Sequence, residues 1–286
     1  MANIFKADKY SLLLPAKKRM KKYLFLGLIG TATIFNSCSS DNDNANDPSE
    51  KRVLLSKITT IYYDNPAQPE TTVSTLEYNA QGELVKTLSD GRVSIFEYNN
   101  GKPVKVNYYN ADHTLEYYTS FAYNGEQLVN IKAIYSNPNF NRSSTYTYNA
   151  NGKLASSTLC QSEDCSHPSI SSYTYNGDNI SVETYLMGGT ISYSNKKEFS
   201  YDDQLNPYTN INKYIKIMME GAYTISKNNY TTEKISYKDN NNGTWIQNQT
   251  NTYSIQYNSD HLPVQVIGKQ SNGQNYVQYN YEYITQ

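Results

Sequence analysis

The sequence predicts an all-β protein in which about 16–17 strands form an antiparallel meander, as a curled sheet or a barrel-like shell. Two observations predict this fold. The 286-residue chain contains 30 tyrosines, one tryptophan and seven phenylalanines. Tyrosine and threonine favour strands, whereas asparagine, aspartate and glycine favour turns. In addition, a strand that ends in tyrosine, followed by Asn or Asp and a tight turn, recurs through most of the chain.

The N-terminal segment predicts export. Lys21 and Lys22 precede an apolar run over residues 23–35, which is shorter than the about 20 residues that a membrane-spanning helix requires. We therefore expect a signal peptide over residues 1–37, with Met20 as a more typical start than Met1. The run ends at Cys38, in Phe-Asn-Ser-Cys, which resembles the lipobox of Bacteroidetes-type lipoproteins. The resemblance implies lipid attachment at Cys38; the alternative is an ordinary buried or disulfide-bonded cysteine.

Residues 38–51 have no aliphatic side chain larger than alanine, and their Asp, Asn and Ser content predicts a flexible tether. Residues 52–286 then form the folded domain. Its turns are expected to begin at residues 79, 99, 124, 149, 176, 202 and 258. The gaps between them are 20–27 residues, except for a last gap of about two periods, with Asn228-Asn229 where a turn is missing. The residues expected to build these turns are Asn79, Gly82, Asn99, Gly101, Asn124, Gly125, Asn149, Gly152, Asn176, Gly177, Asp202 and Asn258.

Each repeat has a physical interpretation. An asparagine at the first position of a type I turn bonds its own backbone, and a glycine three residues later accepts the left-handed conformation. Where Asn-Gly stands alone, a two-residue type I′ hairpin fits better. A period near 25 residues gives two strands and two turns, so the regular turns should line one edge of the sheet and irregular turns the other.

One segment interrupts the repeat. Between Pro207 and Glu220, the residues Ile211, Ile215 and Met218 are spaced for one face of a helix, although alternate residues there also suit a strand. We favour a short helix near 208–219 that covers a sheet face or plugs one end.

Two further cysteines, Cys160 and Cys165, lie close together in the chain. In an oxidising exported compartment, such a pair favours a disulfide that staples a hairpin, and free cysteines are the alternative. A metal site needs two more ligands and only His167 is near, so we expect no metal and no cofactor.

The pattern Tyr-Asn/Asp-x-x-Gly-x-Leu, as in residues 78–84 and 148–154, resembles the YD repeat of RHS-type proteins, whose repeats build a long curling sheet. Residues 201–207 look like a variant found in uncharacterised Bacteroidetes lipoproteins, some of which carry a domain of unknown function described as porin-like. The resemblance covers roughly residues 53–284 and implies hairpins more strongly than a shared function.

These observations predict a non-enzymatic, lipid-anchored protein whose repeat domain has a binding or structural role. The acidic, Ser-rich stretch after Cys38 resembles the export signal of Bacteroidetes surface lipoproteins, which implies a location in the outer membrane, exposed at the cell surface. The partners of the protein are the membrane, through the lipid, and a glycan or protein ligand, because rows of tyrosine offer rigid amphipathic contact area. A formal charge of −1 argues against nucleic acid. Two alternatives are a glycan hydrolase that uses carboxylates from distant strands and a porin-like membrane barrel, which lysine and asparagine on both strand faces disfavour.

Overall fold

The structure, a computed structural model, describes residues 52–188, 193–239 and 242–286. The expected signal peptide, Met20, Cys38 and the tether lie outside the described residues. No helix in the described part of the chain has the length and apolar character needed to cross a bilayer.

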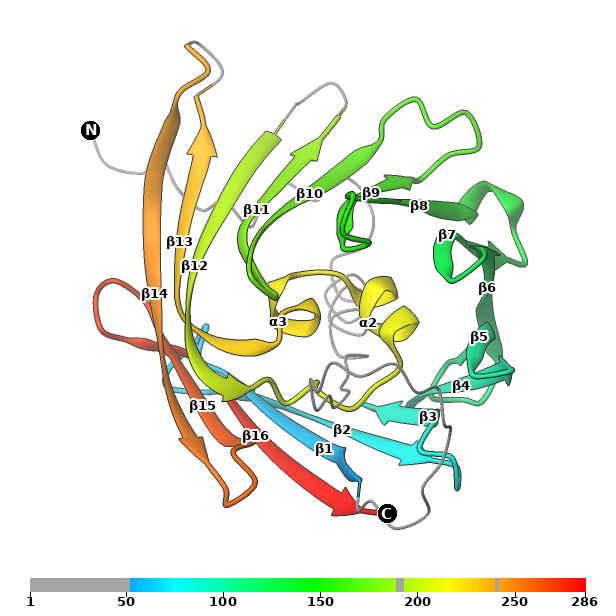
Figure 1. Cartoon of the computed structure of the whole chain (residues 1–286), viewed down its shortest axis with the longest axis horizontal. Helices are drawn as coiled ribbons and strands as arrows, with labels where there is room; N and C mark the ends of the chain where they lie inside the picture. Colours follow the sequence, from blue (N-terminus) through cyan, green and yellow to red (C-terminus); the bar gives the residue numbers. More distant parts are fainter. Residues whose placement is uncertain (1–51, 189–192, 240–241) are drawn as a thin grey trace.

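Sixteen antiparallel strands form a closed barrel (Figure 1). This confirms the predicted all-β meander and shows that, of the two predicted forms, the sheet is a barrel and not an open curled sheet. Each strand pairs with its neighbours in the sequence, and β1 closes the ring against β16. The strands are β1 (Val53–Tyr62), β2 (Glu70–Tyr78), β3 (Leu84–Ser89), β4 (Arg92–Asn99), β5 (Lys102–Tyr109), β6 (Leu115–Asn124), β7 (Gln127–Tyr135), β8 (Arg142–Tyr148), β9 (Leu154–Cys160), β10 (Ser169–Asn176), β11 (Asn179–Met187), β12 (Tyr193–Leu205), β13 (Asn228–Lys238), β14 (Trp245–Tyr257), β15 (Pro263–Lys269) and β16 (Asn275–Thr285).

The long turns of the repeat have the expected geometry. In the turn between β2 and β3, the Asn79 side-chain oxygen accepts hydrogen bonds from the backbone N–H groups of Gln81 and Glu83, and Gly82 has a φ of 75°. The turns that begin at Asn149 and Asn258 repeat this pattern of hydrogen bonds.

The two-residue turns divide into two types. Asn100 and Gly101 both have positive φ, which is the type I′ geometry expected for Asn-Gly. At the other two Asn-Gly sites, however, the asparagine ends the strand, and Gly125 or Gly177 is the first of the two turn residues. Only this glycine has positive φ, so these turns are type II′, and the type I′ prediction is wrong for them.

The tyrosine of the repeat has a role that its sequence pattern did not reveal. In seven even-numbered strands, a tyrosine at or near the end of the strand donates a hydrogen bond from its hydroxyl group. The acceptor is a backbone carbonyl near the start of the preceding strand, over 2.5–2.9 Å. Tyr148, for example, donates to Leu128, and Tyr175 donates to Leu154. Each bond ties together the open end of one hairpin. We call this set the tyrosine latches: Tyr78, Tyr98, Tyr123, Tyr148, Tyr175, Tyr201 and Tyr283.

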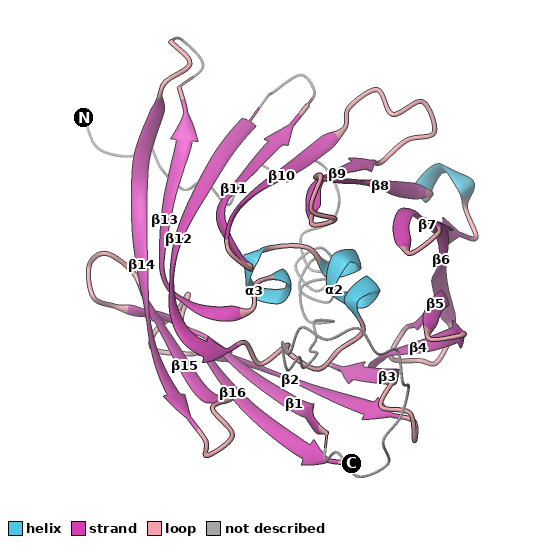
Figure 2. Ribbon diagram, viewed as in Figure 1, coloured by secondary structure: helices cyan, strands magenta, loops and turns pink. Residues whose placement is uncertain are grey.

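The segment between β12 and β13 fills part of the barrel interior. It contains α2 (Lys213–Met219) and α3 (Ala222–Ile225), which lie inside the ring of strands in Figure 2. We call residues 206–227 the plug. Ile215 is fully buried and packs with residues of the barrel wall such as Leu84 and Val106. The short helix expected near 208–219 is therefore present as α2, and it lies inside the ring of strands (Figure 2).

The plug also corrects one turn assignment. Asp202 lies within β12 and does not connect two strands, although its carboxylate accepts a hydrogen bond from the Gln204 backbone N–H as in the repeat turns; Asn228 begins β13 instead of completing a missing repeat. The Asp202 carboxylate accepts a hydrogen bond from Tyr257. Tyr257 ends β14, where a tyrosine latch would otherwise form, so the latch is altered where the plug replaces a turn.

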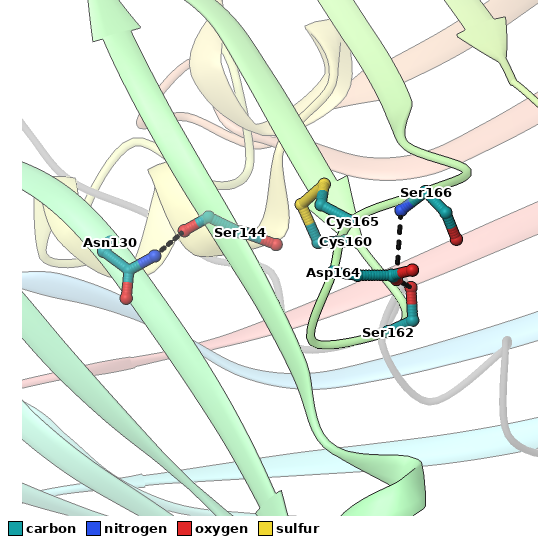
Figure 3. The surroundings of a disulfide bond; sticks show 7 residues. All are labelled: Asn130, Ser144, Cys160, Ser162, Asp164, Cys165 and Ser166. Carbon is teal, nitrogen blue, oxygen red and sulfur yellow. Dashed lines mark hydrogen bonds between the residues drawn. A yellow bond between two sulfur atoms is a disulfide. The ribbon is translucent and has the colours of Figure 1, made fainter.

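Cys160 at the end of β9 is bonded to Cys165 in the loop that follows (Figure 3). Asp164 in the same loop accepts hydrogen bonds from the Ser162 hydroxyl and the Ser166 backbone, so the loop is closed covalently and by side-chain bonds. The disulfide predicted from the spacing is therefore present, and it closes the β9–β10 loop on the end of β9 without joining β9 to β10.

The two faces of the wall differ in chemistry. Successive residues of a strand point to opposite faces, and Ile58 and Leu76 point into the apolar core. Their neighbours on the outer face include charged residues that pair across adjacent strands. These outer ion pairs are Lys57–Glu282 at 2.7 Å, Lys86–Glu77 at 2.6 Å and Lys105–Glu97 at 3.7 Å.

Candidate binding chamber

A cavity of about 660 Å³ lies inside the barrel, between the plug and strands β12 to β16. Among the described residues that line it, eight are tyrosines, contributed by both the plug and the wall. We call this cavity the tyrosine chamber. Its volume falls in the range of small-molecule sites, which are mostly apolar with a few well-placed polar groups.

The rings of the chamber hold one another in place. Tyr230 and Tyr253, on neighbouring strands, meet edge to face with ring centroids 4.7 Å apart. Tyr208 of the plug meets Tyr281 of β16 in the same way, at 6.3 Å. Edge-to-face pairs are favourable for aromatic rings. The plug therefore forms one side of the chamber and is fixed against its wall by ring contacts.

An ion pair between a partly exposed lysine and a buried carboxylate lies among these rings. The Lys197 ammonium of β12 is 3.0 Å from the Glu233 carboxylate of β13, whose side chain is only 8 % exposed. Asn251 and Tyr253 of β14 donate hydrogen bonds to the other carboxylate oxygen, over 2.9 and 3.0 Å. Three neighbouring strands thus place a cation, a carboxylate, an amide and a phenol in one part of the chamber.

The charge state of this group follows from its surroundings. Burial opposes ionisation of Glu233, but the Lys197 charge and the hydrogen bonds hold the pKa of its carboxyl below the ordinary value. Burial likewise acts to lower the pKa of Lys197, yet Glu233 and Glu183 together raise it. The pair is therefore ionised at neutral pH, and it offers donors and acceptors that a polar ligand can share.

Burial raises the pKa of Glu183, although the Lys197 charge and the backbone N–H of Ala222 act to lower it. The Ala222 N–H donates to the Glu183 carboxylate over 3.2 Å. Glu183 therefore links β11 to the plug at the edge of the Lys197–Glu233 pair.

A third acid, Glu220, lies in a smaller cavity of about 240 Å³ that the plug shares with strands β5 to β11. Ser157 and Tyr173 donate hydrogen bonds to one of its carboxylate oxygens, over 2.7 and 3.1 Å. Burial raises the pKa of Glu220 to about 7, despite these hydrogen bonds. Its φ of 57° is unusual for a residue other than glycine, and the packed plug holds it there.

Comparison with known structures identifies the type of barrel. A crystal structure from Bacteroides uniformis aligns with a TM-score of 0.52 at 15 % identity, covering 80 % of this chain and 96 % of that one. A second structure, from Bacteroides vulgatus, aligns at 0.50 and 11 % identity, covering 82 % and 99 %. Both are described as porin-like proteins. The chain therefore shares their barrel fold, as the resemblance to the porin-like domain implied.

The other comparisons assign the chain to no family. No family model and no curated protein matches the chain. A structure of TcdB2-TccC3 aligns over 72 % of this chain with a TM-score of 0.27, which is too low to bear on the fold. The resemblance to YD repeats therefore rests on the turns and strand ends alone.

Most of the residues singled out from the sequence lie away from the chamber, although Asn229 lines it. The turn asparagines and glycines form the end of the barrel, and Cys160 and Cys165 lie in a loop at the other end. Lys197, Glu233 and Asn251 of the chamber were not predicted from the sequence. A signal was present, because Lys197 alternates with Phe199 and Tyr201 and so places a cation on the inward, aromatic face of β12. Among the described residues, no group of three or more His, Cys, Asp or Glu side chains is arranged to hold a metal ion.

Proposed function

We propose that the chain is an exported lipoprotein, anchored through Cys38 to the outer membrane and exposed at the cell surface, whose barrel is a non-catalytic binding module. The tyrosine chamber is the observation that carries the binding role. Its rings offer flat apolar faces, and Lys197, Glu233 and Asn251 offer charged and amide groups beside them. This combination suits a sugar, which has both an apolar ring face and hydroxyl groups.

The chemistry of the outer face favours a barrel whose wall is surrounded by water and not by lipid. A membrane barrel presents an apolar band about 25 Å tall to the lipid and keeps a polar interior. Here the apolar core faces inward, and ion pairs such as Lys57–Glu282 and Lys86–Glu77 lie on the outer face. In this arrangement the anchor, and not the barrel wall, attaches the protein to the membrane.

Binding in the chamber is tested with fragment 50–286, purified without detergent and screened against a panel of glycans. A glycan that binds is then titrated calorimetrically against Glu233→Gln. We expect binding to weaken about tenfold or more, because a hydrogen-bonded buried charge is lost. Glu198→Gln removes a charge from the outer face and should leave affinity unchanged. Turnover of a bound glycan to hydrolysis products would refute the non-catalytic assignment.

The anchor is tested separately, in cells that process lipoproteins. Labelled palmitate should enter the wild-type protein and not Cys38→Ser, and an inhibitor of the lipoprotein signal peptidase should retain the leader. Protease treatment of intact cells then measures surface exposure. Labelling of Cys38→Ser equal to that of wild type would refute the anchor without bearing on the chamber.

A second candidate function is a pore, favoured by the closed 16-strand barrel and its similarity to porin-like structures. Porins of this size leave an aqueous channel. The plug, which bonds to the wall through Asn212, Tyr214 and Glu220, opposes an open channel. Ion conductance across a planar bilayer, together with aggregation of fragment 50–286 in the absence of detergent, would favour the pore.

A further inference from the structure

A third cavity, of about 440 Å³, lies at the end of the barrel formed by the regular turns. Its lining includes Gly152 and Lys153 from the β8–β9 turn, Asp178 from the β10–β11 turn, and residues of the plug. It is lined by a different set of residues from the tyrosine chamber.

Positive charge dominates this cavity. Its described lining contains four lysines and one aspartate, which gives a formal charge of +3. Lys153 is bound to Asp178 at 2.8 Å, so these two charges largely cancel. The remaining positive charge comes from the plug, through Lys216, Lys227 and Lys213, of which Lys213 lies 3.7 Å from the Glu126 carboxylate. We call this cavity the lysine pocket.

Lys216 has the least compensated charge of the three. Ile215 and Met219 on the same helix pack into the core, whereas Lys216 lines the pocket and is half-buried. Among the described residues, its side chain has no ion pair or hydrogen bond. Burial lowers the pKa of Lys216 to about 8, so it is still mostly protonated at neutral pH. A partly desolvated cation without a counter-ion is unfavourable, and a bound anion relieves that cost.

Much of the remaining lining is apolar. Ile217 and Ile225 of the plug line the pocket together with Leu154 and the rings of Tyr148 and Tyr175 from the wall. The hydroxyls of both tyrosines are engaged as tyrosine latches, so their rings are held in position. The pocket therefore combines cations on the plug with a rigid apolar wall, and it has room for more than a small inorganic ion.

We infer that the lysine pocket binds a phosphate or sulfate ester carried on an apolar or ring-shaped body, with Lys216 as its principal cation. Lys213 and Lys227 are more exposed and add to the attraction. The site does not depend on the lipid anchor. The anchor bears only on the source of the ester, because the first described residue, Arg52, pairs with Gln286 at this same end of the barrel. An anchored protein would thus present this end towards the membrane, where lipid headgroups carry phosphate.

The test uses the mature chain, residues 38–286, with Cys38→Ser so that no lipid is attached. Phenyl phosphate and inorganic phosphate are titrated calorimetrically at low salt, and co-sedimentation is measured with phosphatidylglycerol and phosphatidylcholine vesicles. The variants are Lys216→Gln and Lys227→Gln; because Lys227 is exposed, its substitution leaves the fold intact. Lys234→Gln, on the exposed outer face of β13, removes the same charge elsewhere and is the matched control.

We expect phenyl phosphate to bind more tightly than inorganic phosphate, and Lys216→Gln to weaken it about tenfold or more. Lys227→Gln should weaken it about threefold at low salt, and Lys234→Gln should have no effect. Binding only to phosphatidylglycerol vesicles, with the same dependence on Lys216, also supports the site and identifies a lipid headgroup as the source. Absence of saturable binding to every probe, or equal loss in Lys216→Gln and Lys234→Gln, would overturn the proposal.

Discussion

Glu220 gives the sharpest prediction about stability. Its pKa is about 7 in the folded protein, against an ordinary value of 4.5. Burial favours the protonated form, so Glu220 contributes its full share of stability below pH 4.5 and loses it as the pH rises to about 7. Because one pH unit corresponds to about 1.4 kcal/mol, the loss amounts to about 3 kcal/mol.

The substitution Glu220→Gln removes the titration and keeps the shape of the side chain. The amide oxygen can still accept the hydrogen bonds of Ser157 and Tyr173. We therefore expect the variant to match the wild type near pH 4.5 and to exceed its free energy of unfolding by about 3 kcal/mol at pH 8. The raised pKa of Glu183 adds a pH dependence that both proteins share.

The assay is urea denaturation followed by circular dichroism, repeated between pH 4.5 and 8 for both proteins. Glu70→Gln, an exposed position at the start of β2, is the control and should change stability by no more than about 0.5 kcal/mol at any pH. Parallel pH curves for wild type and Glu220→Gln would refute the argument, because they would mean that the carboxyl ionises as freely in the folded protein as in the unfolded chain.

Three further predictions concern the wall. Gly268→Ala should lower the free energy of unfolding by about 1–3 kcal/mol, because a Cβ there would lie 2.9 Å from both Tyr276 and Val277, whereas the exposed Ser254→Ala should be neutral. Loss of the disulfide in Cys160→Ser/Cys165→Ser should cost about 2 kcal/mol, the loop-closure entropy for a separation of five residues, and reductant should abolish the difference between variant and wild type. Tyr148→Phe removes a tyrosine latch and should cost about 1 kcal/mol, while Tyr118→Phe should cost less; equal losses would show that the latch hydrogen bond does not stabilise the barrel.

The sequence allowed the local geometry to be predicted better than the interior. A turn such as Asn79–Gly82 depends on the residues within it, so its type follows from them. The type II′ turns at Gly125 and Gly177 could not be assigned correctly, because the pairing register decides whether the asparagine belongs to the strand or to the turn. The sequence also left open whether the sheet closes, since that depends on β1 meeting β16 across more than 200 residues.

The tyrosine chamber could not be predicted from the sequence for the same reason. Lys197, Glu233 and Asn251 belong to three strands, and only the register of β12, β13 and β14 brings them together. The tyrosine latches are an intermediate case. The repeat indicated that each tyrosine shares a face with the aromatic residue before it, but the carbonyl that it bonds lies on the preceding strand, 14–23 residues earlier.

The same inward arrangement accounts for both the plug and the cavities. A 16-strand barrel is too wide for its own side chains to fill. Here the inner face carries apolar and aromatic side chains beside serines and threonines such as Thr60 and Ser94, so an empty interior would leave apolar surface in water. The plug covers part of this inner surface. Ile215 packs against one side of the barrel wall, while Ala222 and Glu220 form hydrogen bonds with the other side. Because one short segment cannot fill the whole ring, cavities remain on its flanks. The tyrosine chamber and the lysine pocket are two of these spaces, and residues of the plug line both. A ligand in either space would therefore stabilise the plug as well as the wall, so binding should raise the melting temperature of the whole barrel.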